Sequence, residues 1–131
     1  MNKFGRIIIP FGVVPEPHEI RTAQLLIMLG HDVEFLAPVY SKGVRTPDIV
    51  ISGTRWEIKC PSGSSKRTIE NNYVSAAGQC ENVIFDIRAI KIPEERVIKE
   101  IRRQFKSRAR KVKRIIIITK NNKILDLNRG S

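Results

Sequence analysis

PDIVISGTRWEIK, residues 47–59, is the stretch that decides the fold of this 131-residue chain, because it predicts a β-hairpin with charged side chains on one face. Both arms, residues 48–51 and 55–60, are rich in β-branched and aromatic residues, and Ser52-Gly53-Thr54 between them supplies a turn. Side chains alternate between the two faces of a strand, so the length of the turn decides which side chains meet. The chemistry of the charged face therefore depends on the hairpin register.

A two-residue loop, Gly53-Thr54, is expected to place Asp48 opposite Lys59. In the same register Glu57 lies on the same face as these two residues. The other face is expected to pack on the protein core, and it carries Ile49, Ile51, Trp56, Ile58 and Cys60. A three-residue loop would move the register by one residue and separate Asp48 from the other two charged groups.

Two carboxylates in a partly enclosed site raise each other's pKa unless a cation lies between them. Mg²⁺ or Mn²⁺ fits this need, because Mg²⁺ keeps several waters and takes only one or two protein carboxylates together with a substrate phosphate. Asp48 and Glu57 are therefore candidate metal ligands, and Lys59 can orient a metal-bound water and stabilise charge on a scissile phosphate. This pattern predicts hydrolysis of phosphodiester bonds. The alternative is a solvated hairpin face with a cross-strand Lys–Asp pair worth roughly a few tenths of a kcal/mol.

A third acidic residue, Glu19, lies in the helix predicted over residues 17–30. The apolar side of this helix is expected to consist of Ile20, Ala23, Leu26, Ile27 and Leu29. Glu19 falls inside this apolar arc on a helical wheel, so its carboxylate is expected to face the sheet. Two interpretations stay open: Glu19 interacts with the positive end of the helix dipole, or it is the third acidic group of the metal site.

These elements resemble the αβββαβ core of the PD-(D/E)XK nuclease superfamily. The resemblance rests on a helix with an inward Glu19, a strand over residues 32–36, then Pro47-Asp48, then Glu57-Ile58-Lys59, and then a helix and another strand. It implies a restriction-endonuclease-like fold with four catalytic residues, Glu19, Asp48, Glu57 and Lys59. Of these, Glu19, Asp48 and Glu57 would bind the metal.

A narrower resemblance is to the tRNA nuclease domains at the C-termini of CdiA contact-dependent growth inhibition toxins. It is carried by residues 57–61 (EIKCP), residues 66–72 (KRTIENN), Gln79 and residues 83–87 (VIFDI). It implies that a Thr or Gln of the helix after Lys59 touches the substrate. It also makes a cognate immunity protein a candidate partner.

The helix predicted over residues 66–79 has an apolar side and a polar flank. The apolar side contains Ile69, Tyr73, Ala76, Ala77 and Cys80. The polar flank contains Thr68, Asn72, Ser75 and Gln79, and Lys66 stands at the start of the helix. The flank residues Thr68, Asn72, Ser75 and Gln79, together with Lys66, are candidate ligands for a phosphate or a base, and the alternative is that they form a solvated flank.

The whole pattern predicts a single α/β domain over residues 1–131. The further expected elements are strands over residues 6–9 and 82–87, a helix over residues 93–111, and a final hairpin of residues 114–119 and 123–127. They give a mixed central sheet with the αβββαβ core, followed by a C-terminal basic helix and a β-hairpin. Residues 128–131 are expected to form a disordered tail. Cys60 and Cys80 are expected to be buried hydrophobes in a reducing compartment.

The net charge of +11 is concentrated in and after the helix predicted over residues 93–111. From Lys99 to Arg114, nine basic residues stand against Glu100 alone, and the rest of the chain carries only +3. The core stripe of this helix is expected to be Ile98, Ile101, Phe105, Ala109 and Val112, which leaves the charges on the outer face. Clustered Lys and Arg attract nucleic acid by neutralising phosphates. The candidate contacts are Arg102, Arg103, Lys106 and Arg110.

Together these patterns favour a metal-dependent endonuclease that cleaves tRNA as an antibacterial toxin, acting in the cytoplasm of a target cell. No membrane partner is expected, because the stripe opposite the charges lacks Trp and is needed for the core. Two other functions stay open: a DNA endonuclease of the restriction or junction-resolving type, and a basic nucleic-acid-binding module without catalysis. The basic face also has alternatives, a solubilising surface or a contact for an acidic protein such as an immunity protein.

Overall fold

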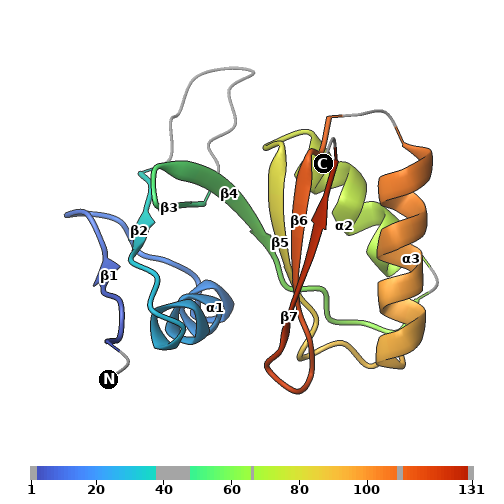
Figure 1. The fold of residues 1–131 in the computed structure, drawn as a ribbon, viewed down its shortest axis with the longest axis horizontal. Coiled ribbons are helices and arrows are strands. Elements are labelled where there is room, and N and C mark those ends of the chain that lie inside the picture. Colours follow the sequence, from blue (N-terminus) through green and yellow to red (C-terminus); the bar gives the residue numbers. More distant parts are fainter. Residues whose placement is uncertain (1–2, 38–47, 66, 109–110, 130–131) are drawn as a thin grey trace.

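The computed structural model describes residues 3–37, 48–65, 67–108 and 111–129. In these residues the chain forms one seven-stranded mixed sheet and three α-helices (Figure 1). The strands are β1 (Ile7–Ile8), β2 (Val33–Phe35), β3 (Ile49–Ile51), β4 (Thr54–Lys59), β5 (Asn82–Asp86), β6 (Arg114–Ile118) and β7 (Ile124–Asn128). The helices are α1 (Pro17–Met28), α2 (Thr68–Ala77) and α3 (Glu94–Ser107). The predicted α/β class is confirmed.

The strands lie in the sheet in the same order as in the chain. β1 and β2 are parallel, β2, β3 and β4 form an antiparallel meander, β4, β5 and β6 are parallel, and β7 returns antiparallel to β6. Each parallel pair needs a crossover connection, and α1, α2 and α3 supply the three crossovers. None of these helices is long and apolar enough to cross a membrane, as judged over the described part of the chain.

The turn between β3 and β4 consists of Ser52 and Gly53, which both have positive φ angles, 50° and 81°. Two positive φ angles are typical of a type I′ turn, whose twist suits a two-residue hairpin. Ile51 therefore pairs with Thr54, and the predicted Gly53-Thr54 loop is wrong by one position. The error arises because the left-handed conformation extends back to Ser52, a residue that adopts it less readily than glycine. The strand register changes by two residues, so every hairpin side chain stays on its predicted face.

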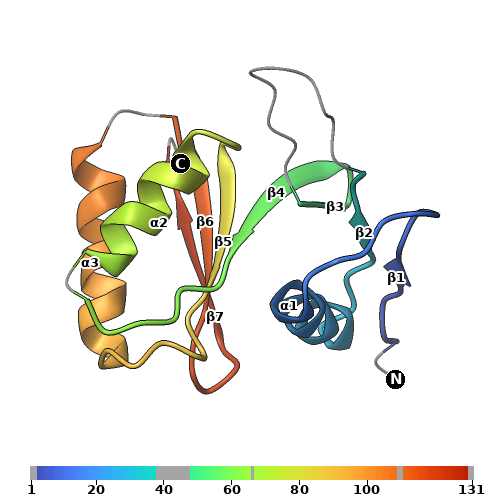
Figure 2. The same ribbon diagram turned by 180° about the vertical axis from the view of Figure 1, so that it is seen from behind.

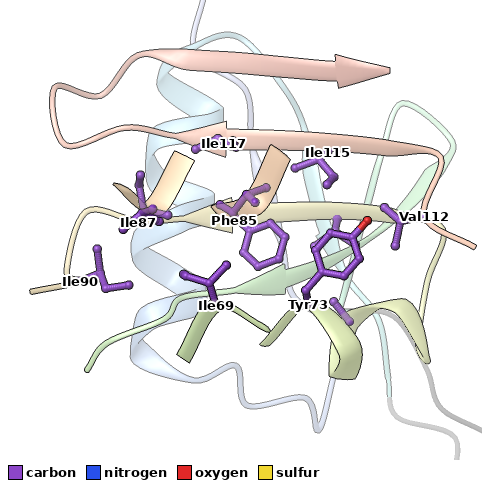
Figure 3. Packing of buried hydrophobic residues seen from close by; sticks show 12 residues of the cluster. Ile69, Tyr73, Phe85, Ile87, Ile90, Val112, Ile115 and Ile117 are labelled. Atoms are coloured by element: carbon purple, nitrogen blue, oxygen red, sulfur yellow. The ribbon is translucent and has the colours of Figure 1, made fainter. Parts of the chain in front are cut away.

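The two faces of the sheet carry separate hydrophobic cores. On one face Ala23 and Leu26 of α1 pack with the hairpin residues Trp56 and Ile58, which confirms the predicted packing side of the hairpin. On the other face, under α2 and α3, the core includes Ile69, Tyr73, Phe85, Ile87, Ile90, Val112, Ile115 and Ile117 (Figure 3). Figure 2 shows α2 and α3 side by side next to β5, β6 and β7, whereas α1 lies at the other end, near β1 and β2.

β6 explains why residues 115–118 are a continuous isoleucine run. Ile115 and Ile117 belong to the core under α2 and α3, whereas Ile116 and Ile118 pack with the core under α1. A strand that is covered on both faces is apolar at every position rather than at alternate ones. The run therefore marks the strand that joins the two cores.

The ends of two helices differ from the prediction. Leu29, expected in the core, is 49% exposed, because α1 ends before it and Gly30, with a φ of 94°, turns the chain. α3 ends at Ser107 instead of at residue 111. The Ser107 hydroxyl donates to the carbonyl of Arg103, and such bonds from a serine side chain compete with the helical ladder.

The buried side of α3 consists of Val97, Ile101 and Gln104. The predicted residues Ile98 and Phe105 are only partly buried, and Ala109 lies outside the described residues. Gln104 is accommodated in the core because its Nε2 donates to the Glu100 carboxylate at 2.9 Å. A pattern based on apolar residues alone misses this position, since the glutamine is polar.

The C-terminal segment is folded as far as Arg129. β7 extends to Asn128, and Arg129 Nε donates to the carbonyl of Val112 at 2.8 Å. The Arg129 guanidinium also lies 3.9 Å from the centre of the Phe105 ring. The predicted disordered tail is therefore wrong for residues 128 and 129, and residues 130–131 lie outside the described part of the chain.

Candidate active site

The polar face of the hairpin brings Asp48, Glu57 and Lys59 together. Asp48 Oδ2 accepts a hydrogen bond from the backbone N–H of Ile58 at 2.8 Å. Glu57 is 3% exposed, and its Oε2 lies 3.3 Å from Lys59 Nζ. Lys59 Nζ also donates to Ser75 Oγ on α2 at 3.2 Å, so a helix on the same side of the sheet fixes the ammonium group. The three residues predicted to share a face therefore do so.

Glu19 joins this cluster from the first turn of α1. Its Oε1 accepts a hydrogen bond from the backbone N–H of Glu16 at 2.8 Å, the bond that a glutamate at the third helical position makes in a capping box. Burial raises the pKa of the Glu19 carboxyl group, and the neighbouring Asp48 raises it further. The two interpretations of Glu19 from the sequence are thus compatible: one carboxylate stabilises the helix end and faces the other acids.

The three acids disturb one another's protonation. Burial, followed by repulsion from Glu57, raises the pKa of Asp48 to about 6 from an ordinary value of 3.8. Burial likewise raises the pKa of Glu57, against the opposing effect of Lys59, and burial is the largest cause of the raised pKa of Glu19. The cluster therefore carries more negative charge than its single lysine neutralises, which is the condition that a bound cation relieves.

The donor set fits a sparsely coordinated divalent cation. Glu57 Oε1 is buried and has no hydrogen-bond partner among the described residues. Within those residues no group of three or more His, Cys, Asp or Glu side chains is placed so that it could hold a metal ion by itself. Mg²⁺ does not need one, because it usually keeps several waters and takes one or two carboxylates. Asp48 and Glu57 can supply these, with Glu19 nearby.

Of the predicted polar flank of α2, Ser75 is the residue that contacts the cluster. Ser75 touches Lys59, whereas Asn72 Nδ2 donates to the carbonyl of Thr68 within its own helix. Gln79 has a buried Oε1 without a hydrogen-bond partner among the described residues. Lys66 lies outside the described residues. The polar flank is therefore partly a support for the lysine, a role that its helical spacing did not indicate.

The basic residues of α3 and the following segment divide into paired and unpaired groups. Four of them form ion pairs within the fold: Arg103 with Glu100, Arg108 with Glu70, Lys113 with Glu81, and Arg114 with Asp126. In α3 and the following segment, the exposed basic residues without an acidic partner in the described part of the chain are Arg96, Lys99, Arg102, Lys106 and Lys111. Arg110 lies outside the described residues. Figure 1 places α3 at the opposite end of the molecule from α1.

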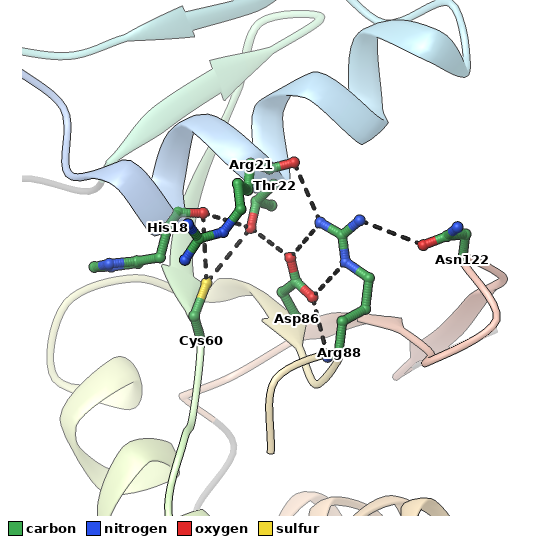
Figure 4. Close-up of polar contacts among 7 residues, drawn as sticks. All are labelled: His18, Arg21, Thr22, Cys60, Asp86, Arg88 and Asn122. Atoms are coloured by element: carbon green, nitrogen blue, oxygen red, sulfur yellow. Dashed lines mark hydrogen bonds and ion pairs between the residues drawn. The ribbon is translucent and has the colours of Figure 1, made fainter. Parts of the chain in front are cut away.

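A second polar cluster, on the α1 side of the sheet, was not predicted from the sequence. Asp86 at the end of β5 accepts hydrogen bonds from Arg88 Nε and Nη2 at 2.9 and 2.8 Å, and from Thr22 Oγ1 at 2.7 Å (Figure 4). Arg88 Nη2 also donates to the carbonyl of Arg21 at 3.2 Å. The only local signal is an Asp-x-Arg pattern after a strand, which is too common to indicate a site.

Comparisons with known proteins agree with the fold. The model of the contact-dependent growth inhibition CdiA C-terminal domain family matches residues 45–124. Among solved structures, the chain is similar to one described as a CdiA-CT/CdiI toxin and immunity complex from Burkholderia pseudomallei, with a TM-score of 0.66 and 20% sequence identity. The similarity covers 95% of this chain and 99% of that chain. No curated protein sequence matches.

The raised pKa of Asp48 predicts that the metal-free protein loses stability as the pH rises. Between the ordinary pKa of 3.8 and the folded value of about 6, the folded protein keeps a proton that the unfolded chain releases, so unfolding becomes easier. From about pH 4 to about pH 7, the melting temperature should fall a few degrees further for wild type than for Asp48→Asn. The asparagine still accepts a hydrogen bond from the Ile58 N–H. If the melting temperatures of the two proteins change equally with pH, the titration of Asp48 does not affect stability, which would contradict this prediction.

Two substitutions separate the roles of Glu19. Glu19→Gln keeps an acceptor for the Glu16 N–H and removes the charge, so its melting temperature should equal or exceed that of wild type. Glu19→Ala also removes the acceptor and should lower stability by roughly 0.5–2 kcal/mol. Both variants should bind Mn²⁺ more weakly in calorimetric titration. Unchanged Mn²⁺ affinity in both would leave Glu19 as a helix-end residue only.

Proposed function

Because the chain belongs to the contact-dependent growth inhibition CdiA C-terminal domain family, we propose that it is a toxin nuclease that acts in the cytoplasm of a target cell. The proposed reaction is divalent-metal-dependent hydrolysis of phosphodiester bonds, with tRNA as the preferred substrate. The observation that carries the proposal is the cluster of Asp48, Glu57 and Lys59, in which a buried, repelling acid pair lies beside an anchored ammonium group.

The chain's own residues supply defined parts of this chemistry. Asp48 and Glu57 would hold Mg²⁺ or Mn²⁺, with Glu19 as a further ligand; the cation would polarise the scissile phosphate and acidify a bound water. Lys59 is held between Glu57 and Ser75, so its ammonium group is oriented before substrate arrives. A preorganised cation of this kind stabilises negative charge that develops on a phosphate in the transition state.

The arrangement of elements supports assignment to the PD-(D/E)XK superfamily as part of the proposal. α1 carries Glu19, the β2-β3-β4 meander carries Asp48 and Glu57, and α2 and parallel β5 follow in the chain. This is the αβββαβ order that the sequence resemblance implies. β1 precedes this core, and α3 with the β6-β7 hairpin follows it.

A long polyanion suits the distribution of charge better than a small substrate does. The acidic cluster lies on the hairpin and α1, whereas the unpaired basic residues of α3 lie at the opposite end of the molecule. A folded RNA can reach both regions, and clustered cations attract it largely independently of its sequence. Charge does not separate RNA from DNA, so a restriction-type or junction-resolving DNA endonuclease and a non-catalytic binding module are the competing proposals.

A cognate immunity protein is the proposed protein partner. The solved structure that resembles this chain is described as a complex of a toxin with an immunity protein. The net charge of +11 favours an acidic partner, because complementary potentials speed association and disfavour wrong partners. The exposed cations of α3 are available for such a contact as well as for nucleic acid.

The catalytic proposal predicts that Asp48→Asn, Glu57→Gln and Lys59→Met each lower the cleavage rate by roughly a hundredfold or more. The first two changes keep side-chain shape, so the fold should survive. Cleavage is measured on total tRNA and on supercoiled plasmid DNA, with Mg²⁺, with Mn²⁺ and with EDTA. Glu81→Gln, which alters an exposed acid outside the cluster, is the matched control.

Undiminished cleavage in EDTA, or full activity in Glu57→Gln, would contradict the metal-nuclease proposal. Cleavage of plasmid but not of tRNA would favour the DNA endonuclease. Binding of either nucleic acid without any cleavage would favour the non-catalytic module. The comparison of tRNA with plasmid DNA therefore tests the substrate class, and the comparison of cleavage with binding tests catalysis.

The unpaired cations of α3 predict a salt-dependent contribution to binding. Substitution of Lys99, Arg102 and Lys106 by Gln should weaken tRNA binding and lower the slope of log affinity against log salt by about 0.7–0.9 for each phosphate that is no longer neutralised. The control replaces three exposed cations elsewhere, Lys3, Arg6 and Lys123, with the same change in net charge. Equal effects in the two triple variants would show that overall charge, and not the α3 face, attracts the substrate.

A further inference from the structure

A cavity of about 420 Å³ lies on the α1 side of the sheet, between the first turns of α1, the segment after β4 and the end of β5. Its lining includes His18, Arg21, Cys60, Ser62, Asp86 and Arg88. His18 directly precedes Glu19 and Cys60 directly follows Lys59 in the chain. Cys60 points to the opposite face of the strand from Lys59, and none of the four proposed catalytic residues lines the cavity. The cavity adjoins the cluster at Glu19, whose charge acts on the Cys60 thiol.

Hydrogen bonds link the polar residues that line the cavity. Asp86 is 5% exposed and accepts three hydrogen bonds from Arg88, two from the guanidinium and one from the backbone N–H, while Thr22 donates a fourth. Burial alone would raise the pKa of Asp86, but the hydrogen bonds from Arg88 and Thr22 lower it. Arg88 donates further to the carbonyl of Arg21 and to Asn122 Oδ1, as Figure 4 shows. The donors of Arg88 are therefore largely used within the protein, and its charge is balanced by Asp86.

Arg21 is the cation of the cavity that the fold does not balance. Its side chain is exposed, and among the described residues no carboxylate lies within ion-pair distance of its guanidinium. Figure 4 shows the guanidinium lying beside His18 and Cys60, on the side of Thr22 away from Arg88. With Asp86 neutralised, the cavity presents a free guanidinium, an imidazole and the Ser62 hydroxyl, which is a donor set for an anion.

We propose that this cavity binds a phosphate of the substrate strand that neighbours the cleaved one, with Arg21 as its main ligand. This inference rests on the proposed nuclease function, because it assigns the cavity to the same nucleic acid. Arginine suits the role, since its planar guanidinium can make two parallel hydrogen bonds to one phosphate. The phosphate would fix the strand relative to Glu19 and Lys59, so that the scissile bond lies over the acidic cluster.

The test compares Arg21→Ala and Arg21→Lys with Arg6→Ala, which removes an exposed arginine elsewhere. With total tRNA, Arg21→Ala should raise KM about tenfold and change kcat little, because the variant lacks a charge-assisted hydrogen bond that is remote from the reacting atoms. Arg21→Lys should restore part of the affinity, since it keeps the charge but not the forked geometry. The Arg21 carbonyl remains in both variants, so the bond from Arg88 and the melting temperature should be preserved.

Binding is measured separately by fluorescence anisotropy of labelled tRNA with Glu57→Gln as the background, where cleavage does not interfere. There Arg21→Ala should lower affinity about tenfold and reduce the salt slope by about 0.7–0.9. If wild type cleaves nothing but Arg21→Ala still weakens binding in this way, the catalytic proposal fails and the phosphate subsite stands. If Arg21→Ala binds and cleaves like Arg6→Ala, the subsite is overturned. A fall in kcat with unchanged KM also overturns it, because Arg21 would then act on the reacting phosphate.

Discussion

The enclosure of like charges at one edge of the hairpin is the constraint on which the rest of the structure depends. Asp48 and Glu57 lie close together and largely out of water, and burial and mutual repulsion both raise the pKa of Asp48. A folded protein keeps such a pair only where other groups offset part of the cost. Here the Ile58 N–H and the Lys59 ammonium group do so incompletely. The remaining imbalance is what makes the site suited to a cation and to phosphate chemistry.

The scaffold holds this strained cluster from two sides of the sheet. On the α2 side, Ser75 fixes Lys59, and the helix packs on the core around Tyr73 and Phe85, whose rings stack with centroids 6.1 Å apart. On the opposite side, Asp86 and Arg88 bind α1 through the Thr22 hydroxyl and the carbonyl of Arg21. These contacts fix the first turns of α1, and thereby the position of Glu19. The acidic site thus depends on residues that are remote from it in sequence.

Charge is separated along the molecule in a way that fits a nucleic-acid enzyme. The acidic cluster lies at the hairpin and α1, whereas α3 carries an outer surface of cations. Of the basic residues of α3 and the position after it, Arg103 and Arg108 are already paired within the fold. Counting basic residues therefore overstates the surface that is available to a polyanion. In the proposed function the unpaired cations attract and orient a substrate, and the acidic cluster performs the chemistry. Because these two regions lie at opposite ends of the molecule, only a substrate of macromolecular size can contact both.

The sequence by itself determined the elements, the mixed α/β class and the shared face of Asp48, Glu57 and Lys59. The elements follow from local periodicity. The shared face follows because a two-residue turn at either position leaves each side chain on the same face of the hairpin. The sequence did not determine the turn position, since the positive φ of Ser52 reflects strand twist and not residue preference. Nor did it show the contact of Ser75 with Lys59, the burial of Gln104 or the network of Asp86, Arg88 and Thr22. Such contacts join residues far apart in the chain or depend on which polar groups find partners, and only tertiary packing decides that.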